Sequence, residues 1–80
     1  MKLTIIAYGI ARDILGSNSI EYEIEDSVSH ENLLENLKKT YPDFNKLTSL
    51  MIAINSEYAK KGQMISENDE VVLIPPVSGG

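Results

Sequence analysis

The 80-residue chain contains no cysteine and a single histidine, His30. The lack of thiols excludes disulfide bonds, thiolate catalysis and cysteine-ligated metal sites together. His30 falls in the first turn of a predicted helix and has no neighbour in the sequence that would complete a catalytic pair or a metal site. We therefore expect His30 to be a solvated surface residue.

Basic side chains are also scarce, since 7 lysines and arginines stand against 12 aspartates and glutamates, which gives a net charge of −5. Phosphate binding requires a basic face, so this balance argues against nucleic acid as a main partner. It argues equally against an anionic membrane surface. A partner with a basic surface is favoured instead.

Long apolar runs are absent, and none approaches the length that would span a bilayer. Residues 1–7 are largely apolar, but Tyr8 and Gly9 interrupt them too soon for a signal peptide. We therefore expect a cytoplasmic protein. The length fits one small domain, and the sequence has no repeat, low-complexity tract or linker.

The pattern of apolar, β-branched and turn residues predicts five short strands and two helices. A short helix is expected over residues 9–16, where Gly16 suits a left-handed C-cap. A longer helix is expected over residues 30–40, with Ser29 as N-cap and Pro42 as the stop. The strands are expected over residues 2–8, 20–25, 51–55, 56–59 and 71–74.

This order of elements describes an α+β fold, a mixed sheet of about five strands with one main helix packed across it. It is the β-grasp, or ubiquitin-like, arrangement. The last strand, residues 71–74, has no polar position, which favours a central place beside the first strand. Alternation puts Leu3, Ile5 and Ala7 on the face beneath the helix. A ferredoxin-type β-grasp is excluded because its cysteine ligands are missing.

Two groups of carboxylates were candidates for chemistry. Glu21, Glu23 and Glu25 alternate with apolar residues along one strand, so we expect them to point into solvent rather than to be catalytic. Their charges also discourage edge-to-edge pairing. Residues 67–70 form an acidic loop without the twelve-residue ligand spacing of a calcium site, and we interpret them as a solvated turn.

The C-terminal stretch is the most informative part of the sequence. Its apolar strand ends at Pro75 and Pro76, which lack N–H donors and cannot continue a sheet ladder. The last two residues are glycines, which would pass through a channel too narrow for any other residue. Residues 75–80, if extended, reach roughly 20 Å. We therefore divide the chain into a domain over residues 1–74 and a tail over residues 75–80.

A terminal carboxylate is unreactive as an electrophile until it is activated, for instance as an acyl-adenylate. The chain has no phosphate-binding loop and no nucleophile–base pair, so another protein must activate it. Without cysteine, any sulfur that the chain carried would sit on Gly80 as a thiocarboxylate. Ile6, Tyr8, Val72 and Ile74 are predicted to form an exposed apolar cluster beside the tail, as at a docking site for another protein.

These segments resemble the small subunits of molybdopterin synthase, the sulfur-carrier family of molybdenum cofactor biosynthesis. The resemblance covers the whole chain. It is most specific over residues 69–80, which match the family's last strand and its Pro-Pro and Gly-Gly tail. Residues 8–16 resemble an aromatic-small-x-x-Arg-acidic-aliphatic-aliphatic-Gly segment, and residues 53–58 resemble the third strand with the apolar position after it.

The resemblance implies that an E1-like adenylyltransferase activates Gly80 with ATP and Mg²⁺, and that Gly80 then becomes a thiocarboxylate. The tail would enter the large subunit of molybdopterin synthase, which holds the catalytic groups, and give sulfur to cyclic pyranopterin monophosphate. The implied assembly is a heterotetramer, and this chain would bind no cofactor itself. The implied partner-binding residues are Tyr8, Arg12, Tyr58, Ile74, Pro75, Pro76, Val77, Ser78 and Gly79.

Three alternatives remain open at this stage. A sulfur carrier of another pathway, such as thiamine thiazole synthesis, shares the fold and the Gly-Gly end, but such chains are typically shorter and lack the Pro-Pro. A ubiquitin-like modifier would be joined to lysines through an isopeptide bond. An interaction module with an inert tail would be unaffected by deletion of Gly79 and Gly80.

Overall fold

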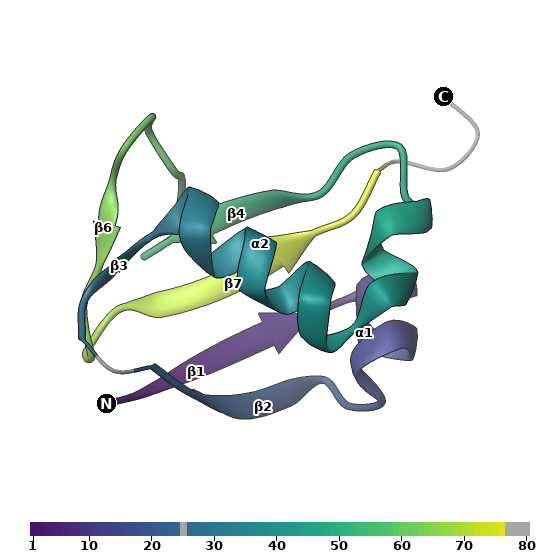
Figure 1. The fold of residues 1–80 in the computed structure, drawn as a ribbon, viewed down its shortest axis with the longest axis horizontal. Helices are drawn as coiled ribbons and strands as arrows, with labels where there is room; N and C mark the ends of the chain where they lie inside the picture. The colour runs from purple at the N-terminus through teal and green to yellow at the C-terminus, as the bar shows by residue number, and fades with distance from the viewer. Residues whose placement is uncertain (25, 77–80) are drawn as a thin grey trace.

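A mixed five-stranded sheet carries one long helix across one face in the computed structural model, which describes residues 1–24 and 26–76 (Figure 1). The strand order is β2-β1-β7-β4-β5, with β7 in the centre. The predicted α+β, β-grasp-like arrangement is confirmed. The strands are β1 (Lys2–Ala7), β2 (Ser19–Glu23), β4 (Met51–Ile54), β5 (Glu57–Tyr58) and β7 (Glu70–Ile74).

The first and last strands lie side by side, as the apolar character of β7 predicted. They are parallel, and Ile5 is opposite Val71 while Ala7 is opposite Leu73. The other neighbours, β2 on β1, β4 on β7 and β5 on β4, are antiparallel. Central placement explains why β7 alternates between fully buried and half-buried residues after its first position.

Both predicted helices are present. α1 (Gly9–Leu15) ends at Gly16, whose φ of 82° is the left-handed cap conformation, and the Gly16 N–H donates to the Arg12 carbonyl at 2.8 Å. α2 (His30–Thr40) begins after Ser29, whose hydroxyl accepts from the Asn32 N–H at 3.2 Å. A 3₁₀ helix, η1 (Pro42–Lys46), lies in the connector toward β4.

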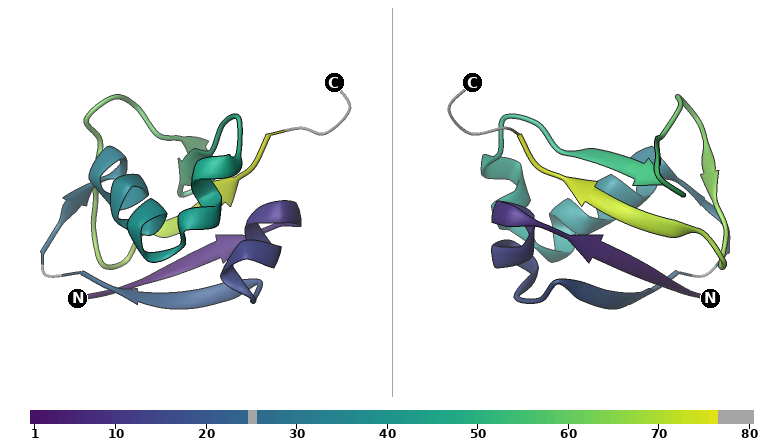
Figure 2. Two further views of the ribbon diagram at one scale, coloured as in Figure 1. Left: turned by 45° about the vertical axis from the view of Figure 1, so that its right-hand side comes forward. Right: turned by 180° about the vertical axis from the view of Figure 1, so that it is seen from behind.

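The core lies between the sheet and α2. Side chains from the covered face of β1 and β7 meet the apolar stripe of α2, and Phe44 of η1 closes one end. Figure 2 shows from behind that no helix of the described residues lies on the opposite face of the sheet. The residues with the least exposure are Leu3, Ile5, Ala7, Ala11, Leu33, Leu37, Phe44, Ile65, Val71 and Leu73.

Two short strands were not predicted. β3 (Val28–Ser29) and β6 (Met64–Ile65) form a separate antiparallel pair, in which Val28 is opposite Ile65. The His30 N–H also donates to the Gln63 carbonyl at 3.0 Å, so this pair holds the start of α2. Ile65 is fully buried, which anchors the segment between β5 and β7 to the core.

The second predicted strand ends earlier than expected, at Glu23, although the Ile24 N–H still donates to the Met1 carbonyl at 2.8 Å. Glu25 lies outside the described residues.

The prediction that His30 is solvated is wrong. Its side chain is 18% exposed, and its Nε2 lies 3.4 Å from Glu31 Oε1 without making a hydrogen bond. The Glu31 carboxylate is also engaged, because its Oε2 accepts from the Gly62 N–H at 2.9 Å. The turn before β6 therefore contacts the first turn of α2, and the His30 side chain is half-buried rather than solvated.

Among the described residues, no helix is both long and apolar enough to cross a lipid bilayer.

Candidate docking site at the end of the last strand

The uncovered face of the sheet carries a row of apolar side chains across four strands. Ile6 on β1 is opposite Val72 on β7, Val72 is opposite Ala53 on β4, and Ala53 is opposite Tyr58 on β5. Opposed residues point to the same side of a sheet, so these four share the face that α2 does not cover. Tyr58 is 61% exposed, which places a large aromatic ring at the outer end of the row.

A second apolar row lies one step further toward the tail. Met51 on β4 is opposite Ile74 on β7, and Tyr8 directly follows the last residue of β1. Met51 is 50% exposed and Tyr8 is 61% exposed, while Ile74 is half-buried. The apolar rows are hereafter called the open-face patch, which comprises Ile6, Tyr8, Met51, Ala53, Tyr58, Val72 and Ile74.

The predicted cluster of Ile6, Tyr8, Val72 and Ile74 therefore lies together on one face, because β1 and β7 are neighbours. The structure adds Met51 and Ala53 from β4, which sequence reasoning did not place there. The missing signal was the register between β4 and β7, which pairs residues about twenty positions apart. No local pattern in the sequence encodes that register.

The turn between β1 and α1 places Tyr8 beside the exit of the tail. Gly9 has a φ of +54°, a left-handed conformation that glycine adopts at low cost. A methyl group added to Gly9 would lie 3.8 Å from Cγ of Pro75, so Pro75 packs close to this turn. Pro75 and Pro76 are both half-buried, which indicates that the chain leaves β7 along the surface of the domain.

Arg12 lies one helical turn beyond Tyr8, and its N–H shares the Tyr8 carbonyl with that of Ala11. Tyr8 is the extended N-cap residue of α1, and Arg12 lies in the helix that begins directly after it. The side chain of Arg12 is 52% exposed, and its Nε lies 3.8 Å from Asp13 Oδ1. Such an exposed pair holds the guanidinium only weakly and leaves it available to a partner.

The other half of the uncovered face is polar. Lys2 and Thr4 on β1 are opposite Glu23 and Glu21 on β2, and Thr4 is also opposite Glu70 on β7. Lys2 Nζ lies 3.8 Å from Glu21 Oε2, and both side chains are exposed. The face therefore changes from charged to apolar along the direction in which β7 runs, and the tail leaves from the apolar half.

The acidic turn before β7 has a structural role that the sequence did not reveal. Asp69 Oδ2 accepts from the Ser66 N–H at 2.8 Å, and Asp69 Oδ1 accepts from the Asn55 side chain at 2.9 Å. The Ser66 N–H and then the Asn55 amide lower the pKa of the Asp69 carboxyl from its usual value. Within the residues that the structure covers, no three acidic or histidine side chains gather as a metal site would require.

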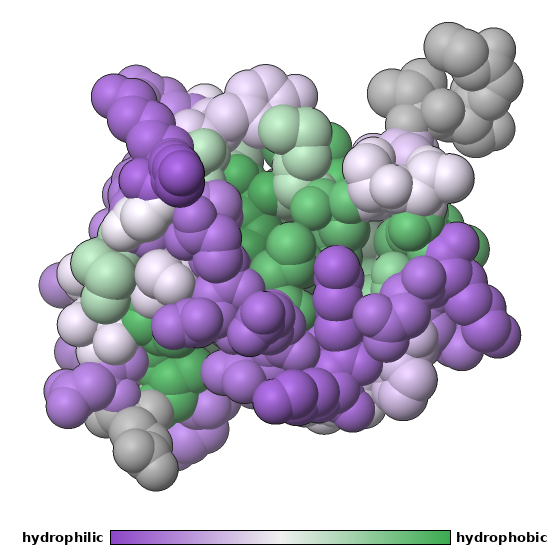
Figure 3. Space-filling model, turned by 45° about the horizontal axis from the view of Figure 1, so that its top comes forward, coloured by the Kyte–Doolittle hydropathy of each residue, from purple (hydrophilic) through white to green (hydrophobic). Residues whose placement is uncertain are grey.

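Apolar surface is not confined to the open-face patch. Figure 3 shows apolar atoms between bands of hydrophilic ones on another side of the molecule. Half-buried hydrophobic residues that pack against the core, such as Leu34, Leu47 and Leu50, contribute to the surface of a domain this small. Exposure alone therefore does not identify the site. What distinguishes the open-face patch is that it surrounds the point where β7 gives way to the tail.

The predicted tail residues Val77, Ser78, Gly79 and Gly80 lie outside the described residues. A model of the ThiS family matches residues 5–80, which include this tail and nearly the whole domain. The chain belongs to the ThiS family.

Relatives of the chain carry a consistent name. A molybdopterin synthase sulfur carrier subunit from Dictyostelium discoideum is 35% identical, over 99% of this chain and 96% of that protein. One from Chlamydomonas reinhardtii is 28% identical over the full length of both. Among solved structures, SAMP1 from Haloferax volcanii is 20% identical over the full length of both chains, with a TM-score of 0.80. That likeness confirms the fold.

Proposed function

We propose that the chain is the sulfur-carrier subunit of a molybdopterin synthase. The observation that carries the proposal is that the central strand β7 ends in Pro75 and Pro76 beside the open-face patch, with a Gly-Gly end only a few residues beyond. The names of the relatives, at up to 35% identity over nearly the whole chain, support the same assignment. In this proposal residues 1–74 are the docking domain and residues 75–80 deliver the reactive terminus.

The proposed chemistry takes place on the Gly80 carboxylate. An E1-like enzyme would join one carboxylate oxygen to the α-phosphate of ATP, with Mg²⁺ balancing the phosphate charges, and release pyrophosphate. A persulfide sulfur of a donor protein would then attack the acyl carbon and displace AMP. A thiol would cleave the resulting acyl disulfide, which leaves a thiocarboxylate on Gly80 and a disulfide between that thiol and the donor. Transfer of that sulfur to cyclic pyranopterin monophosphate in the large subunit would return the carboxylate after hydrolysis, and two such transfers would form the dithiolene.

The open-face patch is the proposed docking surface for both enzymes. Tyr8, Tyr58 and Ile74 would contribute apolar contact area, and the exposed Arg12 guanidinium would pair with a partner carboxylate. Tyr58 stands where the family often has an aliphatic residue, and its 61% exposure leaves the ring free to adapt. Residues 75–79 would occupy the channel that leads to the large subunit's catalytic groups, within a heterotetramer of two small and two large subunits.

The experiment that tests the proposal is the intact mass of the protein purified from its own host. A species in which one oxygen is replaced by sulfur, localised to Gly80 by fragmentation, is the expected result. An unmodified carboxylate after incubation with the activating enzyme, ATP, Mg²⁺ and a sulfur donor would contradict it. Reconstitution with the large subunit and the pterin substrate then assigns the pathway, because a carrier for thiamine thiazole synthesis would give no molybdopterin.

A ubiquitin-like modifier is the second candidate, since conjugation begins from the same activated glycine. The solved neighbours called small archaeal modifier protein 1 have the same fold, although identity of 20% carries no function by itself. The same purification distinguishes the two roles. Chains joined through Gly80 to lysines of other proteins, found by digestion and mass spectrometry, would favour a modifier. Free thiocarboxylate without such conjugates would favour the carrier.

A further inference from the structure

β2 leaves a free hydrogen-bonding edge on the side of the sheet away from β1. Ile24 and Met1 exchange hydrogen bonds, since the Ile24 N–H donates to the Met1 carbonyl at 2.8 Å and the Met1 amino group donates to the Ile24 carbonyl. In an antiparallel pair of strands, residue pairs that exchange hydrogen bonds alternate with pairs whose backbone groups point away from the other strand. Lys2 with Glu23, and Thr4 with Glu21, are pairs of the second kind. The backbone N–H and C=O groups of Glu21 and Glu23 therefore point to the free edge.

The edge lies open in the described part of the chain. β2 is the terminal strand of the five-stranded sheet, and it forms the lower border of the molecule in Figure 1. Its five residues are long enough to pair with another extended segment through both outward-pointing positions. An open edge with unpaired peptide groups is a template for an added strand.

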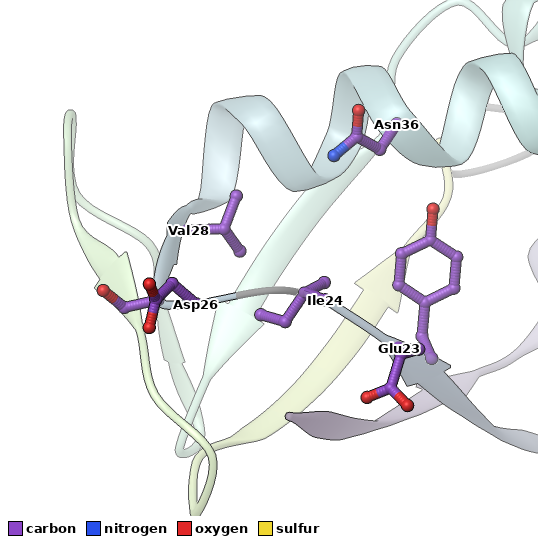
Figure 4. Close-up of a pocket in the computed structure, with 7 residues that line it drawn as sticks. Glu23, Ile24, Asp26, Val28 and Asn36 are labelled. Carbon is purple, nitrogen blue, oxygen red and sulfur yellow. The ribbon is translucent and has the colours of Figure 1, made fainter.

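A pocket of about 400 Å³ adjoins this edge on the side of α2. Tyr22, Ile24 and Val28 form its apolar wall, and the other lining residues are polar: Glu23, Asp26, Ser27 and Asn36. Figure 4 shows the Ile24 and Val28 side chains turned toward one another, with the Asn36 amide above them and the Glu23 carboxylate directed away from α2. The Tyr22 hydroxyl lies 3.4 Å from Thr40 Oγ1, which fixes the ring between β2 and α2.

The side chains on the two faces of β2 determine which residue types would suit an added strand. A residue opposite Glu21 or Glu23 would share their side of the sheet and face their carboxylates. The next residue along would face α2 and enter the pocket against its apolar wall, because side chains alternate with a period of two. Glu21 and Glu23 are about 70% exposed, and their pairing with Lys2 and the Met1 amino group is solvated and weak.

We propose that the β2 edge binds an extended partner segment in which lysine or arginine alternates with apolar residues. The partner's main chain would bond to the peptide groups of Glu21 and Glu23, its basic side chains would face the two carboxylates, and one apolar side chain would fill the pocket beside Ile24 and Val28. The same carboxylates oppose the pairing of two copies of this chain, whose β2 strands would bring like charges together. This surface is separate from the open-face patch.

The test is a titration of the full nitrogen-15-labelled chain with a short, capped peptide of alternating arginine and valine. We expect saturable amide shifts centred on Glu21, Tyr22 and Glu23 and on residues that line the pocket. A peptide of alternating glutamate and valine should not bind. A peptide of alternating arginine and serine should bind more weakly, because serine makes no apolar contact with the wall formed by Tyr22, Ile24 and Val28.

Two variants separate the backbone and charge contributions. Glu23→Pro removes the Glu23 carboxylate together with an outward N–H that the sheet itself does not use, so the fold should persist while peptide affinity falls at least tenfold, more than loss of the carboxylates alone produces. Should this variant fail to fold, the double variant Glu21→Gln/Glu23→Gln tests the charges alone. It should weaken binding roughly two- to tenfold, as expected for two exposed ion pairs. Its matched control, Glu35→Gln/Glu57→Gln, has the same net charge and should bind like the wild type.

Three results would overturn the proposal. One is the absence of saturable binding at millimolar peptide. Another is equal weakening in the matched control, which would indicate attraction by net charge rather than by the edge. The third is a dimer, seen by sedimentation and broken by Glu23→Pro, which would assign the edge to a second copy of this chain.

Discussion

Asn55 joins the turn after β4 to the turn before β7 through its side chain. Its Nδ2 donates to Asp69 Oδ1 at 2.9 Å, and its Oδ1 accepts from the Glu70 N–H at 2.9 Å. Asn55 and Ser56 both have positive φ values, 53° and 73°, as a tight two-residue hairpin requires. Asparagine tolerates this conformation and also supplies both hydrogen-bonding groups, so one residue fixes the hairpin and the start of the central strand.

Asp69 makes this connection sensitive to acid. Its pKa is lowered in the folded protein, so the carboxylate stabilises the fold above its unfolded pKa, and this contribution is lost as the pH falls through the folded value. We expect Asp69→Asn to lower the free energy of unfolding by about 1 kcal/mol at neutral pH, a modest value because solvent competes at this turn. Below about pH 4 the difference from wild type should shrink.

Urea denaturation at a series of pH values measures this effect. The control is Glu67→Gln, which removes an exposed carboxylate from the same loop. If the free energies of unfolding of wild type and Asp69→Asn differed by the same amount across the acid range, the ionised form of Asp69 would not be the stabilising one.

Gly9 is predicted to be the least replaceable residue of the turn that presents Tyr8. With φ at +54° and Pro75 nearby, Gly9→Val should destabilise the fold by about 1–2 kcal/mol, because a β-branched residue is strained in the left-handed region. Gly9→Asn is the matched control, since asparagine adopts this conformation more readily. Thermal unfolding should rank wild type above Gly9→Asn and Gly9→Asn above Gly9→Val. Equal melting temperatures for the two variants would contradict the backbone argument.

Much of this fold follows from local sequence signals. The Ser29 cap, the Gly16 cap, the stop at Pro42 and the apolar strand at residues 71–74 are all local features, and each element appears where it was predicted. β3 and β6 were missed because each has two residues, and their pairing of Val28 with Ile65 depends on a contact distant in the sequence. The partial burial of His30 was missed for the same reason, because the turn that bonds to the start of α2 at Gly62 and Gln63 is distant in the sequence.

The candidate site divides in the same way. Tyr8 and Ile74 were predicted together, in one cluster with Ile6 and Val72, because the first and last strands were expected to pair, whereas Tyr58 came from the family resemblance. Their gathering on one face with Met51 depends on the order β1-β7-β4-β5, which brings residues from both ends and the middle of the chain together. The outward-pointing peptide groups of β2 were not predicted from the sequence, because they depend on which alternate residues of β2 form hydrogen bonds with β1.

Ile74→Lys should weaken binding to the large subunit more than it weakens folding. Ile74 is half-buried in the isolated chain, so its further burial in a complex is expected to contribute at the lower end of the range for such a side chain, about 1.5 kcal/mol. That corresponds to a roughly tenfold higher Kd. Isothermal titration with the large subunit measures it, and unfolding of the free variant gives the cost to stability.

Thr4→Lys is the control for Ile74→Lys, because it adds the same charge to the polar half of the same face. It should leave the Kd within about twofold of wild type. If both variants weakened binding equally, a general charge effect rather than the open-face patch would account for the loss.

Deletion of Gly80, or extension of the chain by one residue, should abolish sulfur transfer and leave the fold intact. The proposed chemistry needs a free carboxyl group at a fixed distance from the docking domain. Deletion or extension by one residue moves that group by about 3.5 Å. Reconstituted molybdopterin synthesis measures the activity, and thermal unfolding checks that the domain persists. Ser78→Ala is the comparison, since it alters a proposed channel residue without moving the end of the chain, and it should reduce activity far less than either change. Full activity in the extended chain would exclude the terminal carboxylate as the carrier group.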